Sequence, residues 1–568
     1  MAQAAPRSTI TTTLVTLSRA LWPVLLGIGI FMAIGGLGFN PSDEGLVNAA
    51  ASRVLQGQVP HTDFIWPRPV GSAYLHLPEL LLPTPMVLTS RAVALAELVA
   101  YSLLFGALVI DRSSLRWTVP ESLAVATSVL VSMHAYPLMA WYTVDGLLFI
   151  GLGAVLLRWA LRRSSLAGIA IAFLALGIAT TFKQSFWPAP VFGLIWLVIA
   201  SPRSQWLVRA AAAVAAAALP GILYVGAVVL SGGMAEMITQ LGSGEPVIGE
   251  ELVEALDDLR VIALLVAGAG AFVLHRMLDV PRFATWPRLL RLVPLAVVAT
   301  LLIGAVVAGG MGMRGSWGIV LWCLVVLRVA VDLAFTRRWD WPGMVLIGTG
   351  WMVTLSWGAA VPNLLSGSLA LFVLYRARDE TAESIRWRQV TPFAVASLLF
   401  ALGVVPTFAI ARTQTIYRDR PASALTVDLG TVHPEMAGVM TNPVTAAYLE
   451  QLEECVESHP AGRVAALPDN AYIYPLLGLR NPLPIDWIIP ADITGSEDRI
   501  VAAAREIDRA GDYLVLFQTV SVAPLATFER LEPAADGGFR EPALGARIRE
   551  SFSGPPVSCG VFEGFWSP

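Results

Sequence analysis

Long runs of apolar residues, separated by short polar segments, occupy most of the chain. They cover approximately residues 21–38, 87–110, 119–137, 144–161, 165–182, 187–200, 206–231, 259–277, 290–311, 316–335, 342–359, 361–376 and 391–410. An α-helix needs about 20 apolar residues to cross a bilayer, and most of these runs are close to that length. The pattern predicts an α-helical polytopic membrane protein with about thirteen transmembrane helices.

The pattern changes after residue 411, where long apolar runs end and charged and proline residues become frequent. Five later segments are typical of two helices and three short strands, namely 441–459 and 496–510, then 462–468, 512–518 and 558–565. We therefore expect a transmembrane domain over residues 1–411 and a compact α/β domain over residues 412–568.

The composition supports a lipid environment. Hydrophobic residues make up 56% of the 568 residues and charged residues only 14%, and the mean hydropathy is +0.66. A soluble chain of this length could not bury so much apolar surface. The net charge of −4 gives no reason to expect a nucleic-acid partner.

Arginines fall on alternate loops between the apolar runs. With a cytoplasmic N-terminus, the inner loops and helix ends carry Arg112, Arg116, Arg158, Arg162, Arg163, Arg203, Arg209, Arg276, Arg282, Arg288, Arg291, Arg337, Arg338, Arg376, Arg378, Arg386 and Arg388. The outer loops carry few basic residues, and loop 232–258 is acidic. Because cytoplasmic loops are enriched in Lys and Arg, we expect a plasma (inner) membrane protein whose loop 39–86 and C-terminal domain are extracytoplasmic. In that oxidising compartment Cys455 and Cys559 can form a disulfide.

The first loop, which we define as residues 39–86, is rich in polar and aromatic residues. Ser42 can cap a helix whose first turn contains Asp43 and Glu44, and apolar residues then recur at helical spacing. This spacing predicts a short helix lying on the membrane surface. Behind it come His61, Asp63, Trp66, Arg68, Tyr74 and His76. Such a composition indicates a binding site. Glu97, in the next apolar run, is a further functional candidate because acids are costly inside a membrane.

Common nucleotide, redox and zinc motifs are missing from the sequence. It contains no GxxxxGK[ST], HExxH, CxxC or GxSxG pattern, no GxGxxG after a soluble strand, and no internal repeat. This argues against ATP-driven transport, nicotinamide chemistry and zinc-dependent hydrolysis. The acids of the first loop remain as the main candidates for chemistry.

Several features together resemble the GT-C membrane glycosyltransferases, and more narrowly the branch of the protein O-mannosyltransferases and the lipid A aminoarabinose transferase. In this sequence they are Asp43-Glu44, then Gly57 and Pro60 after the helix, Trp66-Pro67-Arg68-Pro69 leading to Tyr74, Asp145 in WYTVDGLLF, and Lys183 in TTFKQ. Arg68 stands where the family usually has Lys. The resemblance covers residues 1–200 in motif and the remainder in architecture.

The resemblance implies an inverting glycosyltransferase of cell-envelope biosynthesis. It would move mannose, or a pentose such as arabinofuranose, from a polyprenyl-phosphate carrier to an extracytoplasmic glycan, lipid or protein acceptor. Asp43 would be the general base and Glu44 would orient the acceptor, while Arg68 and Lys183 would hold the donor phosphate. The substrate-binding candidates are His61, Asp145, Tyr74 and Trp66. The expected reaction requires no cofactor and no metal ion.

Other interpretations stay open on sequence alone. A flippase or transporter for lipid-linked sugars would use the same cavity without a base, and a polyprenyl-diphosphate glycan ligase would use Arg and His at the reacting centre. A receptor or scaffold anchored in the membrane would need far fewer spans. The candidate residues also have structural alternatives: acids can complement helix termini, basic residues can reach lipid headgroups, and aromatic residues can lie at the membrane interface.

Overall fold

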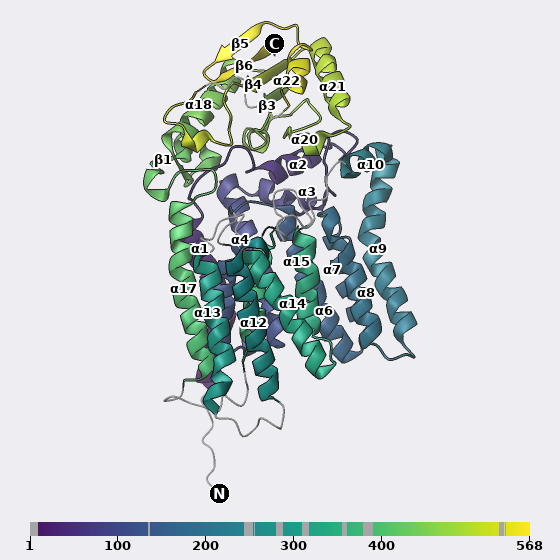
Figure 1. Ribbon diagram of the computed structural model, residues 1–568. Helices are drawn as coiled ribbons and strands as arrows, with labels where there is room; N and C mark the ends of the chain where they lie inside the picture. The colour runs from purple at the N-terminus through teal and green to yellow at the C-terminus, as the bar shows by residue number, and fades with distance from the viewer. Residues whose placement is uncertain are drawn as a thin grey trace.

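A helix bundle and a small sheet region make up the computed structural model of the protein (Figure 1). The structure describes residues 9–568 apart from positions 84, 134–136, 243–253, 255, 280–287, 309–316, 355–360, 379–389, 533–538 and 540. The C-terminal region covers one end of the bundle, and the first loop, with α2 (Leu46–Leu55) and α3 (Gly71–Leu75), lies between the two.

Eight helices among the described residues are long and apolar enough to cross a membrane. Their spans are Leu17–Ile34 within α1 (Thr9–Ile34), α4 (Met86–Ile110), α6 (Tyr142–Arg163), α9 (Trp206–Leu230), α12 (Leu259–Leu278), Leu289–Val307 across η5 (Arg288–Leu292) and α13 (Val293–Ala308), α14 (Trp317–Thr336) and α17 (Pro392–Gln414). An apolar segment in lipid must pair its own backbone groups, and a helix does so. The chain is therefore a multi-pass membrane protein.

Among the described residues, the other five expected spans form shorter helices; residues 134–136 and 355–359 of the expected spans 119–137 and 342–359 lie outside the described residues. These helices are α5 (Val119–Met133), α7 (Leu166–Ala179), α8 (Pro188–Ala200), α15 (Trp341–Thr354) and α16 (Ser366–Arg376), with 15, 14, 13, 14 and 11 residues. Thirteen spans are thus not confirmed. Helix α16 shows why composition misleads: it is buried from Ser366 to Tyr375, and a helix surrounded by protein is as apolar as one surrounded by lipid.

Many of the arginines predicted on inner loops gather at the bundle end away from the C-terminal region. Five of them, Arg158, Arg162, Arg276, Arg338 and Arg376, line one cavity there. Arg282, Arg386 and Arg388 lie outside the described residues, as do residues 243–253 and 255 of the acidic loop 232–258; the described part of this loop includes α10 (Met234–Gly242).

The C-terminal region is built around a four-stranded sheet with the order β3-β4-β6-β5. Strands β3 (Val464–Leu467) and β4 (Tyr513–Gln518) are parallel, and β5 (Pro556–Cys559) and β6 (Phe562–Ser567) form an antiparallel hairpin beside β4. The helices are α18 (Pro443–Ser458), α19 (Ile473–Leu476), α20 (Pro490–Ile493), α21 (Glu497–Ala510) and α22 (Pro542–Arg549), and β1 (Val427–Asp428) pairs with β2 (Met440–Thr441). The predictions of α18, α21, β3 and β4 are confirmed, whereas segment 558–565 straddles two strands.

Strand β4 is buried on both faces because helices cover each side of the sheet. Leu514 and Leu516 pack in a cluster with α18 and the first loop, whereas Tyr513, Val515 and Phe517 pack with α21 and α22. Successive side chains of a strand point to opposite faces, so one strand contributes to both cores. Its continuous apolar sequence follows from this double burial.

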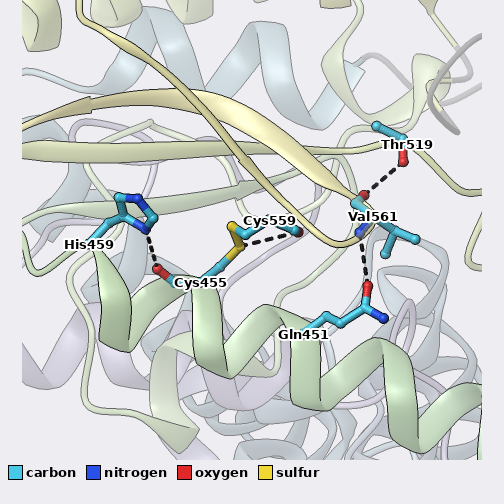
Figure 2. Close-up of a disulfide and its surroundings, with 6 residues drawn as sticks. All are labelled: Gln451, Cys455, His459, Thr519, Cys559 and Val561. Atoms are coloured by element: carbon cyan, nitrogen blue, oxygen red, sulfur yellow. Dashed lines mark hydrogen bonds between the residues drawn. A yellow bond between two sulfur atoms is a disulfide. The ribbon is translucent and has the colours of Figure 1, made fainter.

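A disulfide between Cys455 and Cys559 joins α18 to the end of β5 (Figure 2). The two Cα atoms are 5.9 Å apart, a separation usual for disulfides. Gln451, one turn earlier in α18, accepts a hydrogen bond from the backbone N–H of Val561 at 2.9 Å, so the hairpin is held to the helix at two points.

Candidate functional site

The first loop is buried between the bundle and the C-terminal region. Its residues Phe39, Phe64 and Trp66 share one hydrophobic core with Tyr448 and Tyr472 of the C-terminal region. A buried ion pair adds to this contact: the Arg53 guanidinium donates to both carboxylate oxygens of Asp486, at 2.7 and 2.8 Å. The loop therefore forms one packed unit with the region that covers it.

Helix α2 begins later than its sequence predicts. Gly45 precedes it with φ 86°, and a Cβ there would lie 2.6 Å from the Cα of Tyr472. Ser42 does not cap the helix; its hydroxyl lies 3.3 Å from Asp469. Asp43 and Glu44 consequently lie in the preceding turn. The prediction of a helix on the membrane surface is also wrong, because the C-terminal region covers α2 and buries it from Leu46 to Arg53.

Asp43 is surrounded by hydrogen-bond donors. Its Oδ2 accepts from the amide of Asn40 at 3.0 Å and from the hydroxyl of Tyr417, and the Arg418 guanidinium lies 3.2 Å away. Tyr417 and Arg418 follow α17, so they are more than 370 positions away from Asp43 in the sequence. Only 5% of Asp43 is exposed, so these donors and the surrounding protein enclose the carboxylate.

Glu44 has a different environment from its neighbour. It accepts two parallel bonds from Arg91 of α4, at 2.6 and 2.8 Å. The same guanidinium donates to the backbone carbonyls of Gly35 and Gly38 after α1, at 2.7 and 2.6 Å. Such a bidentate pair is strong and geometrically fixed. Glu44 therefore fastens the first loop to α1 and α4.

Two buried cations flank the ring of Tyr142 at the start of α6. The Arg68 guanidinium stacks on the ring at 4.4 Å from its centroid and lies 3.5 Å from the Asp492 carboxylate. The Lys183 Nζ lies 5.8 Å from the same centroid and has no hydrogen-bond partner among the described residues. Burial, and then the Arg68 charge, lower the pKa of Lys183 well below its usual value. Asp43 also interacts electrostatically with Tyr142.

Both ring nitrogens of His61 contact protein groups. Nδ1 lies 2.7 Å from Gln240 Oε1 in α10, and Nε2 contacts the Tyr224 hydroxyl in α9. Burial is the main cause that lowers the pKa of His61, so the ring is neutral. In this arrangement His61 joins the first loop to α9 and α10.

Asp145 lies in the first turn of α6 and is completely buried. Its Oδ1 is 3.2 Å from Nε2 of His76, whose Nδ1 contacts Glu79. Burial lowers the pKa of His76, but the Asp145 and Glu79 carboxylates outweigh it and raise that pKa well above its usual value. One carboxylate oxygen of Glu97, in α4, belongs to the same group: His76, Glu97 and Asp145 each offer a ligand atom within 4.8 Å of the others.

The two aromatic candidates lie in different environments. Trp66 is 4% exposed and packs in the core shared with the C-terminal region, whereas Tyr74 is 51% exposed. Only Trp66 is therefore enclosed with the rest of the first loop.

Asp43 lines neither of the two cavities that lie at the ends of the bundle. A cavity of about 40 Å³ is lined by Glu44, Arg91 and Tyr417, which is room for water and not for a sugar. A cavity of about 710 Å³ lies at the other end of the bundle, beside Arg158 and Arg162. Since α6 begins at Tyr142 and has 22 residues, the two ends are about 30 Å apart.

Sequence reasoning missed the residues that reach the first loop from far along the chain. Tyr417, Arg418 and Asp492 contact Asp43 and Arg68, and Arg91 holds Glu44. The segment YRDR, residues 417–420, lies shortly after the last apolar run and was a usable signal, because it places charge at the membrane boundary on the predicted side. No protein-family profile matches the chain, and no curated protein is similar to it in sequence.

Proposed function

We propose that the protein is a GT-C-type glycosyltransferase that moves a sugar from a polyprenyl phosphate to an extracytoplasmic acceptor. The observation that carries the proposal is the Lys183 ammonium, which is 3% exposed and has no hydrogen-bond partner among the described residues. A buried cation without a counter-charge costs several kcal/mol. A site that keeps one beside a second cation, Arg68, is suited to receive an anion such as a phosphate.

Asp43 is the proposed general base. As the acceptor oxygen attacks the anomeric carbon, its proton passes to the Asp43 carboxylate, and the bond to the carrier phosphate breaks with both electrons on the phosphate oxygen. Lys183 and Arg68 stabilise that leaving charge. The acceptor hydroxyl takes the place of one of the present donors to Asp43. Attack from the side opposite the phosphate inverts the anomeric centre.

The proposal includes the topology expected from the sequence. The N-terminus is cytoplasmic, about thirteen helices cross or enter the membrane, and residues 412–568 form an extracytoplasmic domain. The disulfide between Cys455 and Cys559 supports this side, since such bonds persist in oxidising compartments. The C-terminal region covers Asp43 and Arg68, so it is positioned to shape the acceptor side of the site.

The test is sugar transfer by the purified protein from a panel of polyprenyl-phosphate sugars, including mannose and arabinofuranose, to envelope glycans. Transfer with inversion supports the proposal and names the donor. If no donor supports transfer but lipid-linked sugar moves across liposome membranes, the protein is a flippase and not a glycosyltransferase. Transfer only from polyprenyl-diphosphate glycans would replace it with a ligase.

A further inference from the structure

Four ionisable side chains from separate elements meet beside α6, and no arginine or lysine among the described residues forms an ion pair with them. They are His76 at the end of α3, Glu79 in η1 (Leu77–Leu81), Glu97 in α4 and Asp145 in α6, and none is more than 7% exposed. Among the described residues, the ion pairs of this group are those between His76 and the Glu79 and Asp145 carboxylates.

The charges of this group do not balance. Three carboxylates share a single imidazole, and burying unpaired charge is costly. Glu97 Oε2 and Asp145 Oδ2 are both buried and have no hydrogen-bond donor among the described residues. Two buried acceptor oxygens without donors, close to a histidine nitrogen, are suited to hold a cation.

We propose that His76, Glu97 and Asp145 bind a divalent metal ion, with Zn²⁺ as the ion that fits this ligand set best. One imidazole nitrogen and two carboxylate oxygens are ordinary zinc ligands. Bonds of about 2.0 Å in a tetrahedral site place two ligands about 3.3 Å apart. His76 Nε2 lies 3.2 Å from Oδ1 of Asp145, the other oxygen of the carboxylate whose Oδ2 has no donor among the described residues.

The neighbours of His76 form the support that metal-binding histidines usually have. Glu79 contacts Nδ1, which directs Nε2 toward Asp145. Asn48 of α2 donates to Glu79 Oε2 at 3.2 Å, and Ser90 donates to Asn48 at 3.2 Å. A carboxylate on the second ring nitrogen fixes the tautomer and the ring orientation of a ligating histidine.

The ion connects three parts of the structure. It fastens the end of α3 to α4 and α6, and so holds the first loop on the bundle. Asp145 is one turn after Tyr142, on which Arg68 stacks, so the ion also fixes the helix that carries the two cations. Three protein ligands leave a fourth position for water. This inference does not depend on glycosyl transfer, because the group is defined by its own geometry.

The test is the metal content of the purified, tag-free protein after dialysis against Zn²⁺ and removal of loosely bound ions. We expect about one Zn²⁺ per chain in the wild type and less than about a tenth of that in the double variant Glu97→Gln, Asp145→Asn. Glu79→Gln removes only the support of His76 and should weaken Zn²⁺ binding by about 10- to 100-fold. Glu121→Gln, a change at another buried carboxylate, and Asp43→Asn should both keep the ion.

Three results would overturn the proposal. A wild type without metal whose thermal midpoint is unchanged by Zn²⁺ or Mn²⁺ would show that a proton balances the group, with His76 charged and Glu97 neutral. Zn²⁺ retained by the double variant would place the ion elsewhere. If the double variant does not fold, the X-ray absorption spectrum of the wild-type metal decides: one imidazole with oxygen ligands supports the site, and sulfur or oxygen-only ligands contradict it. Asp43→Asn that keeps its ion but transfers no sugar separates this inference from the proposed function.

Discussion

The two ends of the helix bundle handle buried charge differently. At the end away from the C-terminal region, carboxylates have arginine partners. Asp332 accepts from Arg276 at 2.6 Å and from Arg328 at 3.0 Å. Asp340 accepts from Arg376 at 2.8 Å. This end has the cavity of about 710 Å³, and its charges are largely matched within the protein.

At the first-loop end, matched and unmatched charges lie side by side. Glu44 is paired with Arg91, yet Lys183, Glu97 and Asp145 each have a buried polar atom without a partner among the described residues. The cavity of about 710 Å³ and the unmatched buried charges therefore lie at opposite ends of the helix bundle. Burying an unmatched charge lowers stability, and such charges are typical of functional sites. We therefore assign the function to the first-loop end and not to the end with the large cavity.

The largest expected effect on stability is at the matched end. Asp332→Asn leaves the Arg328 guanidinium, 1% exposed, without its carboxylate, and should cost about 3–5 kcal/mol of unfolding free energy. Sugar transfer per folded molecule should stay unchanged. Denaturation in detergent with a transfer assay on the folded fraction measures both. Equal stability of variant and wild type would show that the ion pair between Asp332 and Arg328 does not stabilise the fold.

The opposite behaviour is expected of Lys183. Lys183→Met removes a positive charge from the phosphate site and should lower kcat about 100- to 1000-fold. Stability should stay equal or rise, because the buried ammonium has no partner to lose. Arg203→Gln, a change at an exposed cation in the loop between α8 and α9, serves as the control and should keep full activity. Transfer by Lys183→Met within a factor of about three of the wild type would remove Lys183 from the chemistry.

Removing the disulfide tests whether the first-loop end of the bundle depends on the C-terminal region that covers it. Replacing Cys455 and Cys559 with Ala frees a loop with 104 residues of sequence separation and should cost about 2–4 kcal/mol. The loss should appear as a lower thermal midpoint, and the same shift should follow from a reducing agent on the wild type only. If the reducing agent shifts the thermal midpoint of the wild type and of the variant equally, its effect does not come from this disulfide.

The smallest effect concerns pH. Because the pKa of Lys183 is lowered, its ammonium loses its proton at a lower pH than an ordinary lysine, and phosphate binding should weaken as pH rises through that value. Between that pKa and about 10.4 the unfolded chain binds the extra proton, so stability of the unliganded protein rises with pH. Lys183→Arg stays charged and should make donor binding independent of pH in this range. Identical pH profiles of the donor KM for the wild type and Lys183→Arg would contradict the assignment of Lys183 to phosphate binding.

Local patterns predicted the elements that depend on local sequence. The long apolar helices follow from runs of about 20 residues, and α18, α21, β3 and β4 follow from their periodicity and turn residues. Helix α2 was misplaced because its start is set by Gly45 against Tyr472, a contact between residues more than 400 positions apart. No local pattern contains that information.

The candidate site shows the same limit. Asp43, Arg68 and Lys183 could be chosen one by one, as could Glu97 and Asp145. Their grouping could not, because it depends on how α4, α6 and the first loop pack. The sequence separation of 374 between Asp43 and Tyr417 illustrates the difficulty. Residue type indicates which side chains can act, and packing decides which of them have partners.

The most direct test of the account is transfer by Asp43→Asn beside Asp63→Asn, each with the donor that the wild type uses. Both substitutions exchange one oxygen for nitrogen in the same loop, but Asp63 is exposed and bonds to the backbone of Val59. A general base contributes about 100- to 10,000-fold, so Asp43→Asn should lose transfer by at least about 100-fold while Asp63→Asn retains it. Equal transfer by the two folded variants would contradict the account and remove the chemistry from Asp43.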